Sequence, residues 1–372
     1  MSGMSTHRVS RRRFLDRVGS ATLIAAAPAV AGATQQSAAM PSAGSLTDVT
    51  GIRVGHFTDT RRPTGCTAIL FDKPVTAGAD YDGSAPAESL GVMLQPVSPL
   101  DHIHAVLFTG AGPLALGAAA GVIRFLEERR IGYDWGVPNV RIPIVVSAAI
   151  DDLALGDARI RVGPDDAYRA CQSAGPAAVA EGSVGAGAGA TVGKMFVGRG
   201  MSGMKGGVGT ASTRAGDITM AALVVVNAAG DILDWRQGTI VAGARNADGH
   251  SFARTVDVLR RDLQTRPAVN APLADSPLRA TTLVLVATNA ALTKTQLTKL
   301  AMMANTGAAR AINPYHTQGD GDQVLAVSTG DSNAQVSLTA IGAIAAEVVA
   351  DAIVRAVKTA TGVPGWPAVR DL

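Results

Sequence analysis

A proline-rich connector divides the chain into two parts, and the shorter part cannot fold alone. Residues 264–280, QTRPAVNAPLADSPLRA, place Pro, Asn, Asp and Ser between two ordered blocks, which is the composition of an exposed linker. Residues 281–372 offer only two strands and two helices, too few to enclose a core of their own. Their strands must therefore complete a sheet that begins upstream. A cut at the end of the connector would leave two subunits of one fold.

Apolar strands and helices alternate on both sides of this connector. Hydrophobic residues make up 47% of the 372 residues and charged residues 17%, which is ample for a sizeable core. One expected helix, 165–182, has an acidic start, and another, 334–359, is apolar around much of its circumference and should lie between layers. The pattern predicts an α/β (α+β) domain with buried sheets covered by helices. The expected strands are 51–57, 66–71, 104–110, 142–150, a pair within 219–234, 281–288 and 323–329.

The first 45 residues are expected to lie outside this fold. Residues 10–20, SRRRFLDRVGS, carry an arginine pair followed by Phe-Leu, and a short apolar run with small-residue cleavage candidates extends to residue 33. This order is typical of a twin-arginine signal peptide over residues 1–33, although a basic tail is the alternative. Residues 34–45 read as a flexible spacer. We therefore expect a periplasmic or secreted protein.

The export signal carries the excess of positive charge. Residues 1–33 contain five Arg and one Asp, a net charge of +4, so their removal changes the formal net charge from +3 to about −1. The remaining sequence shows no basic stripe with interleaved aromatic residues, which argues against nucleic acid as a partner. It also contains no apolar run long enough for a stable membrane span.

The glycine-rich segment around Lys194 does not fit a nucleotide site. Ala188 stands where a phosphate loop requires Gly, and Met195 stands where it requires Ser or Thr. A dinucleotide fingerprint is weak as well, because no clear strand precedes the glycines. His102 and His104 have the spacing of metal ligands but lack a third partner nearby. We therefore expect no cofactor and no metal.

Two adjacent threonines, Thr281 and Thr282, open the strand after the connector. Their β-branched side chains suit a strand start, which is the simpler explanation. The alternative is a chain cut before Thr281, which then becomes an N-terminal nucleophile. Lys194 is equally ambiguous, because it is either a surface lysine or an amine set in backbone that can approach a ligand closely. The residues alone leave both questions open.

Four segments taken together resemble a family of self-processing amide hydrolases, which includes NylC-type nylon-oligomer hydrolases and DmpA/BapA-type aminopeptidases. The resemblance extends roughly from residue 46 to residue 360. It implies a four-layer αββα sandwich of the N-terminal-nucleophile type, as in DmpA and ornithine acetyltransferase. It also implies a cut that yields a large chain, 46–280, and a small chain, 281–372. The segments are 182-GSVGAGAGATVGK-194, 222-ALVVVNAAGDILD-234, 281-TTLVLVATNAALTK-294 and 310-RAINPYHTQGDGDQV-324.

The resemblance assigns roles to five residues. The nucleophile matches Thr281, and a threonine at this position favours the NylC-like branch over the serine-dependent aminopeptidases. The implied activity is hydrolysis of linear amide bonds, in peptides, β-peptides or 6-aminohexanoate-type oligomers, by a homo-oligomer of processed protomers. The other catalytic residues implied are Lys194, Asn227, Asp320 and Asp322.

This sequence departs from the family pattern at the residue before the expected cut. NylC-like chains have Asn there, and this chain has Ala280. The fold-related ornithine acetyltransferases cut between Ala and Thr, so an acyltransferase is one alternative function, and an uncut, non-catalytic periplasmic binding protein is another. His316 is expected to be structural although it lies near the aspartates. Cys66 and Cys171 are expected as free, non-catalytic thiols.

Overall fold

The strands that follow the connector lie in the middle of the main sheet. The computed structural model describes residues 44–265 and 280–372, and the statements below concern these residues. Strand β12 (Thr281–Ala290) pairs antiparallel with β9 (Ile218–Asn227) on one side and parallel with β14 (Gln323–Ser332) on the other. The prediction that the C-terminal part completes a sheet begun upstream is confirmed.

The main sheet has two halves, and one long strand belongs to both. β2 (Thr64–Asp80) pairs along its first half with β1 (Ile52–Asp59) and near its end with β14. Because β2 runs through both halves, the two halves can face each other and still form one hydrogen-bonded sheet. Among the described residues the strand order is β3-β5-β4-β2-β14-β12-β9-β8, with β1 beside β2. The strands not yet given are β3 (Glu88–Ser89), β4 (His102–Thr109), β5 (Val145–Ala149) and β8 (Gly207–Ala215).

Alternate side chains of β12 pack into two different cores. Val284 and Val286 join a cluster with helices α4 (Lys294–Ala311) and α5 (Leu338–Thr359). Leu283 and Leu285 join a second cluster, which contains residues of β1, β2, β4 and β5. Successive side chains of a strand point to opposite faces. β12 is therefore buried on both faces, which explains why its sequence is a continuous apolar run.

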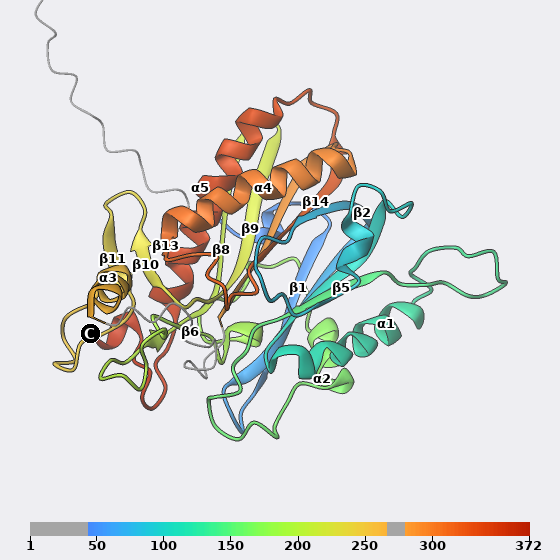
Figure 1. Ribbon diagram of the computed structural model, residues 1–372. Helices are drawn as coiled ribbons and strands as arrows, with labels where there is room; N and C mark the ends of the chain where they lie inside the picture. The colour runs from blue at the N-terminus through green and yellow to red at the C-terminus, as the bar shows by residue number, and fades with distance from the viewer. Residues whose placement is uncertain (1–43, 266–279) are drawn as a thin grey trace, which may run out of the picture. The chain divides into compact units, whose positions relative to one another are not determined.

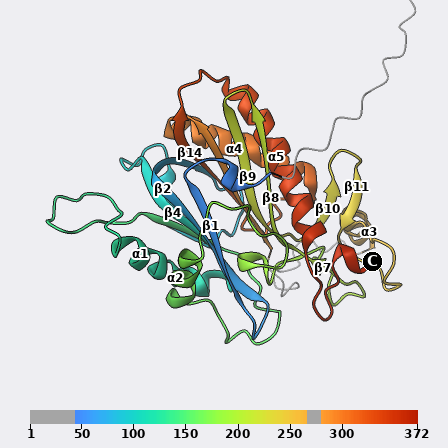
Figure 2. The same cartoon turned by 180° about the vertical axis from the view of Figure 1, so that it is seen from behind.

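A third core completes the layered arrangement. It joins the outer face of β2 and β4 to helices α1 (Ala119–Glu127) and α2 (Pro164–Gln172). The order of layers is thus α4 and α5, the sheet half with β9, β12 and β14, the half with β4 and β5, and α1 with α2 (Figures 1 and 2). Three apolar cores separate four layers, so the predicted αββα sandwich is confirmed.

Shorter elements sit at the margins of these layers. Helix α3 (Thr255–Thr265) precedes the connector, and η4 (Gly112–Ala118) leads into α1. A small three-stranded sheet contains β10 (Asp231–Asp234), β11 (Thr239–Ala242) and β13 (Ile312–Asn313). A two-stranded sheet joins β6 (Thr191–Val192) to β7 (Met204–Lys205). The remaining short helices are η2 (Leu46–Asp48), η3 (Gly91–Leu94), η5 (Gly185–Gly187) and η7 (Val369–Asp371).

Two expected helices are shorter than the sequence pattern indicated. The helix predicted over 165–182 ends at Gln172, because the Gly-Pro pair at 175–176 cannot continue it. The helix predicted over 334–359 begins only at Leu338, where the Ser337 hydroxyl accepts a hydrogen bond from the Ala340 N–H. Such side-chain caps define helix starts. Within the described ranges, no helix has the length and hydropathy needed to cross a membrane.

Candidate active site

Thr281 begins β12 at the edge of the sheet where β9 ends and β14 also begins. Its side chain is 5% exposed, and its backbone stands opposite Asn227 in the antiparallel register with β9. The Thr281 hydroxyl donates a hydrogen bond to the carbonyl oxygen of Ala280, with 2.6 Å between the oxygens. The hydroxyl therefore lies directly beside the carbonyl group of the bond at which the sequence predicts cleavage.

Gly321 supplies a second donor to the same carbonyl, and sequence reasoning did not identify it. The Gly321 N–H donates to the Ala280 oxygen at 3.1 Å. A Cβ at this position would lie 2.9 Å from Thr281 Oγ1 and 2.5 Å from the Ala85 oxygen. Only glycine allows the backbone to approach this closely. The glycine between the two aspartates of the Asp-x-Asp pair was the available signal.

The turn that contains Gly321 brings both predicted aspartates to the start of β12. Asp322 Oδ1 accepts a hydrogen bond from the Thr282 N–H at 2.5 Å, and the backbone of Asp320 bridges to that of Ala280. Asp320 Oδ2 accepts from the Thr317 N–H at 2.8 Å. Its other oxygen, Oδ1, is buried and has no partner among the described residues. Asp320 therefore has a free acceptor beside the predicted cleavage site.

The chemistry of Asp320 is altered by its surroundings. Burial, followed by the neighbouring charge of Asp322, raises the pKa of Asp320 to about 6, although hydrogen bonds from Thr317 oppose the change. Two carboxylates close together disfavour each other's ionisation. Asp320 can therefore exchange a proton near neutral pH, as a general acid or base requires.

His316 contacts one member of this carboxylate pair, Asp322, although the sequence favoured a structural role. Its Nδ1 lies 3.4 Å from Asp322 Oδ2, and its Nε2 lies 3.1 Å from the Asn305 side-chain nitrogen. Burial lowers the pKa of His316, but the adjacent Asp322 carboxylate and the charges of the other nearby aspartates outweigh it and raise the pKa overall. The His316 backbone N–H also donates to Asp322 Oδ2 at 3.3 Å, so His316 and Thr282 bind different oxygens of this carboxylate.

Lys194 lies against Asn227, and both are fully buried. Lys194 Nζ donates to Asn227 Oδ1 at 2.5 Å and to Thr191 Oγ1 at 3.2 Å. The Asn227 side-chain nitrogen donates to the Asp151 carbonyl at 3.1 Å, so one of its two N–H groups is already used. Asn227 thus pairs with Thr281 through the strand register and with Lys194 through its side-chain oxygen.

Burial determines the protonation of Lys194. It lowers the pKa of the ammonium group to about 7, while the charges of Asp151 and Asp320 act in the opposite direction. The alternative of a surface lysine, left open by the sequence, is wrong, because the side chain is 1% exposed. A buried amine that titrates near neutrality is typical of functional lysines.

A second buried lysine, Lys205, holds the segment that carries Lys194. Its Nζ donates to the carbonyl oxygens of Gly187, Ala190 and Gly206 at 3.0, 2.8 and 3.2 Å. Each of the three ammonium hydrogens therefore has a carbonyl acceptor. The sequence did not suggest this role, because nothing in the glycine-rich pattern distinguishes an inward-pointing lysine from an exposed one.

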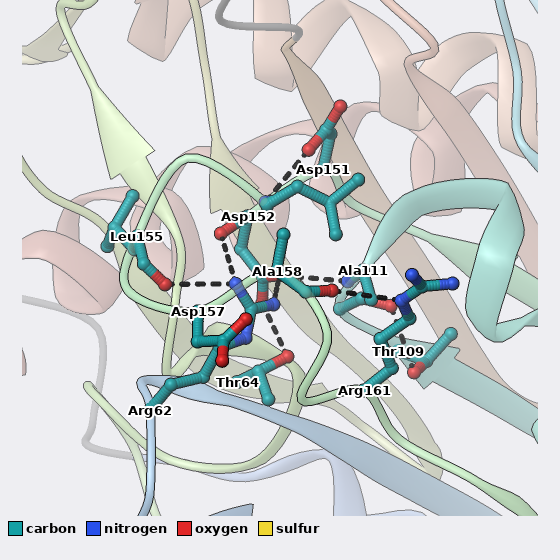
Figure 3. Close-up of polar contacts among 12 residues, drawn as sticks. Arg62, Thr64, Thr109, Ala111, Asp151, Asp152, Leu155, Asp157, Ala158 and Arg161 are labelled. Carbon is teal, nitrogen blue, oxygen red and sulfur yellow. Dashed lines mark hydrogen bonds and ion pairs between the residues drawn. The ribbon is translucent and has the colours of Figure 1, made fainter.

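A buried ion pair fixes the loop that supports Asn227. Asp152 forms an ion pair with Arg62 and accepts hydrogen bonds from the Thr64 hydroxyl at 2.8 Å and the Ala111 N–H at 2.9 Å (Figure 3). Arg62 also donates to the carbonyl oxygens of Asp152 and Leu155. A charge pair buried this deeply needs such hydrogen bonds to offset its desolvation. The network holds the loop after β5, where the Asp151 carbonyl receives Asn227.

The remaining residues considered from the sequence have structural positions. His104 Nδ1 accepts a hydrogen bond from the Ile144 N–H at 3.0 Å. Cys66 and Cys171 are free and buried, and burial raises the pKa of both thiols, which disfavours the reactive thiolate. Across residues 44–265 and 280–372, no group of three His, Cys, Asp or Glu side chains is placed to hold a metal ion.

Comparison with known proteins identifies the family. The sequence model of peptidase family S58 matches residues 44–369. The chain belongs to peptidase family S58. An uncharacterized aminopeptidase of Mycobacterium tuberculosis is 36% identical over 358 residues, which cover 88% of this chain and 97% of that protein. A 6-aminohexanoate-oligomer endohydrolase of an Agromyces species is 32% identical over 324 residues, covering 84% and 85%.

Solved structures support the same assignment for this S58 peptidase. A β-aminopeptidase from a Burkholderia species has a TM-score of 0.61 at 25% identity and covers 86% of this chain and 88% of its own. The L-aminopeptidase D-Ala-esterase/amidase of Ochrobactrum anthropi has the same TM-score and coverage at 23% identity, and shows the likeness of fold to a variant of the Ntn hydrolases. The resemblance read from the four sequence segments is confirmed, and the protein is an amide-bond hydrolase.

Proposed function

We propose that this S58 peptidase cuts itself between Ala280 and Thr281 and then hydrolyses linear amides with Thr281 as its N-terminal nucleophile. The observation that carries the proposal is the environment of the Ala280 carbonyl, which receives both the Thr281 hydroxyl and the Gly321 N–H. A nucleophile and an oxyanion donor thus meet at one backbone carbonyl. The products are the chains 46–280 and 281–372 of a mature protein.

Self-cleavage follows from this geometry in two steps. Thr281 Oγ1 attacks the Ala280 carbonyl carbon and passes its proton to the unpartnered Oδ1 of Asp320. The carbon–nitrogen bond then breaks, the nitrogen takes the proton from Asp320, and an ester joins Ala280 to the Thr281 oxygen. Water hydrolyses the ester and releases the Ala280 carboxylate. The Gly321 N–H stabilises the negative charge that develops on the carbonyl oxygen.

The cut creates the base that the mature enzyme needs. A free α-amine has an ordinary pKa of about 8 and can accept the proton of its own hydroxyl. The substrate carbonyl takes the place of the Ala280 carbonyl, again beside the Gly321 N–H. Lys194 holds Asn227 opposite Thr281, and its positive charge favours the negatively charged intermediate. Asp320 pairs with the amine whenever the amine is protonated.

The names of the relatives support linear amides as the substrates. The names of the similar proteins include aminopeptidases and a 6-aminohexanoate-oligomer endohydrolase, so we propose peptides, β-peptides or 6-aminohexanoate-type oligomers. The test offers the purified protein these three kinds of amide, with and without an added amine as acyl acceptor. We expect free acids as the main products. Transfer of most acyl groups to the added amine would instead establish an acyltransferase, and no turnover at all would contradict both functions.

We also propose that the protein is exported, on the support of the twin-arginine pattern at residues 10–20. Changing Arg11 and Arg12 to lysine should retain the protein in the cytoplasm, because the arginine pair is the feature that this export system reads. Fractionation of cells that express each form gives the answer. Equal amounts of both forms outside the cytoplasm would contradict export by this route.

A further inference from the structure

Gln323 is a buried side chain without a partner close to the nucleophile. It is 0% exposed, and neither its amide nitrogen nor its amide oxygen has a hydrogen-bond partner among the described residues. Leaving a carboxamide unpaired in the interior lowers stability for each unsatisfied group. An apolar side chain would avoid that cost, so the carboxamide calls for an explanation beyond stability.

Register places Gln323 on the same face of the sheet as Thr281. Leu283 of β12 pairs with Gln323 of β14, and Thr281 lies two residues before Leu283. Side chains two residues apart point the same way, and Leu283 belongs to the central core between the two sheet halves. A strand spacing of about 4.8 Å and a rise of about 3.3 Å per residue separate the backbones of Thr281 and Gln323 by about 8 Å.

Asn227 belongs to the same face, so Gln323 extends an existing row. Asn227 is opposite Thr281 and two residues beyond Val225, which packs in the central core. Three polar side chains from β9, β12 and β14 therefore share one end of one sheet face. Both ends of the Asn227 carboxamide have hydrogen-bond partners, the oxygen in Lys194 and Thr191 and the nitrogen in Asp151, whereas neither end of the Gln323 carboxamide has one among the described residues.

Gln323 lies close enough to Thr281 to contact a substrate that extends beyond the cleaved amide. We propose that the Gln323 carboxamide binds a second amide group of the substrate, beside the amide that is cleaved. A carboxamide has donors and an acceptor, and can pair with both the C=O and the N–H of such a group. The inference rests on the proposed function of Thr281 and adds a preference for substrates with two or more amides.

The test compares a substrate with one amide and a substrate with two. An alanine anilide has one amide, and the corresponding dialanine anilide has two; loss of each is followed by chromatography. In Gln323→Met, which keeps the size of the side chain, we expect kcat/KM for the dialanine anilide to fall by about 10- to 100-fold, the value of one or two hydrogen bonds. The alanine anilide should change by less than about 3-fold. Gln335→Met, at an exposed position, should affect neither substrate.

Folding of the same variants provides the second readout. Since Gln323 has no partner to lose, Gln323→Met should be cut at residue 280 and be at least as stable to urea as the parent protein. A marked loss of stability would show a structural role and contradict the inference, as would equal effects on the two substrates in Gln323→Met or in the shorter Gln323→Asn. A parent protein inactive on both anilides would contradict the proposed function itself.

Discussion

Thr281→Ala is expected to yield one unbroken chain that hydrolyses amides at least about 10⁴-fold more slowly than the parent protein. The variant lacks the oxygen that we propose attacks the Ala280 carbonyl, so the chain should not cut itself and no free α-amine should form at residue 281. Loss of a catalytic nucleophile typically costs this much or more. Denaturing gels show whether the chain is cut, and initial rates on a linear amide measure the loss.

The neighbouring threonine provides a matched control. Thr282 is also buried, but its hydroxyl has no hydrogen-bond partner in the described structure, and its backbone N–H already binds Asp322. Thr282→Val keeps the shape of the side chain and should be cut and active like the parent protein. If Thr281→Ala is still cut at residue 280, or if Thr282→Val is not cut, the assignment of Thr281 as the nucleophile is wrong.

Lys194→Met is expected to lower kcat by about 100- to 1000-fold, the usual effect of removing one charge-stabilising donor. The variant leaves Asn227 Oδ1 without the ammonium group that holds it opposite Thr281. The methionine side chain is close in size to lysine, so the buried site stays filled. Lys294→Met serves as the control, because Lys294 is another buried lysine, bonded to three backbone carbonyls.

Lys294 lies beyond the opposite end of β12, about 30 Å of strand from Thr281. Lys294→Met should therefore lower stability, since it leaves three carbonyls unpaired, but it should keep the kcat of the parent protein. Equal losses of kcat in both variants would show that Lys194 acts only through folding.

The low pKa of Lys194 should also make the stability of the folded chain depend on pH. Its pKa is about 7 in the folded chain and 10.5 when unperturbed, so between these values the unfolded chain binds more protons. Stability should then rise with pH from about 7 to about 10.5 through this group. Burial also lowers the pKa of Lys205 to about 7, so Lys205 contributes to the same rise in stability. Urea unfolding at pH 7 and pH 9 should show a smaller rise in Lys194→Met than in the parent protein.

The joining of the C-terminal part to an upstream sheet was predictable from the sequence of one strand, whereas the order of the four layers was implied by the family resemblance. The apolar run of β12 is buried on both faces, and a short C-terminal part that contains such a strand must join a sheet made elsewhere. Helix ends were less predictable, since Gly175 and Pro176 had to be weighed against a helical pattern that continues past them. The cap at Ser337 likewise decides where α5 begins, although apolar residues precede it.

The candidate site was predictable only in part, because several contributions come from the backbone. The resemblance assigned Thr281, Lys194, Asn227 and the two aspartates from side-chain identities. The Gly321 N–H and the carbonyls that hold Lys205 have no side-chain signature, since every residue carries these groups. Arg62 and Asp152 are 90 residues apart, and no local pattern connects them.

The most direct test is the mass and N-terminal sequence of the purified, active protein. Self-cleavage predicts two fragments, the smaller of which starts at Thr281 and carries a free threonine amine. The fraction of cut chain should rise in step with activity as freshly made protein matures. A fully active sample that consists of one intact chain, with residue 281 still joined to residue 280, would contradict the account.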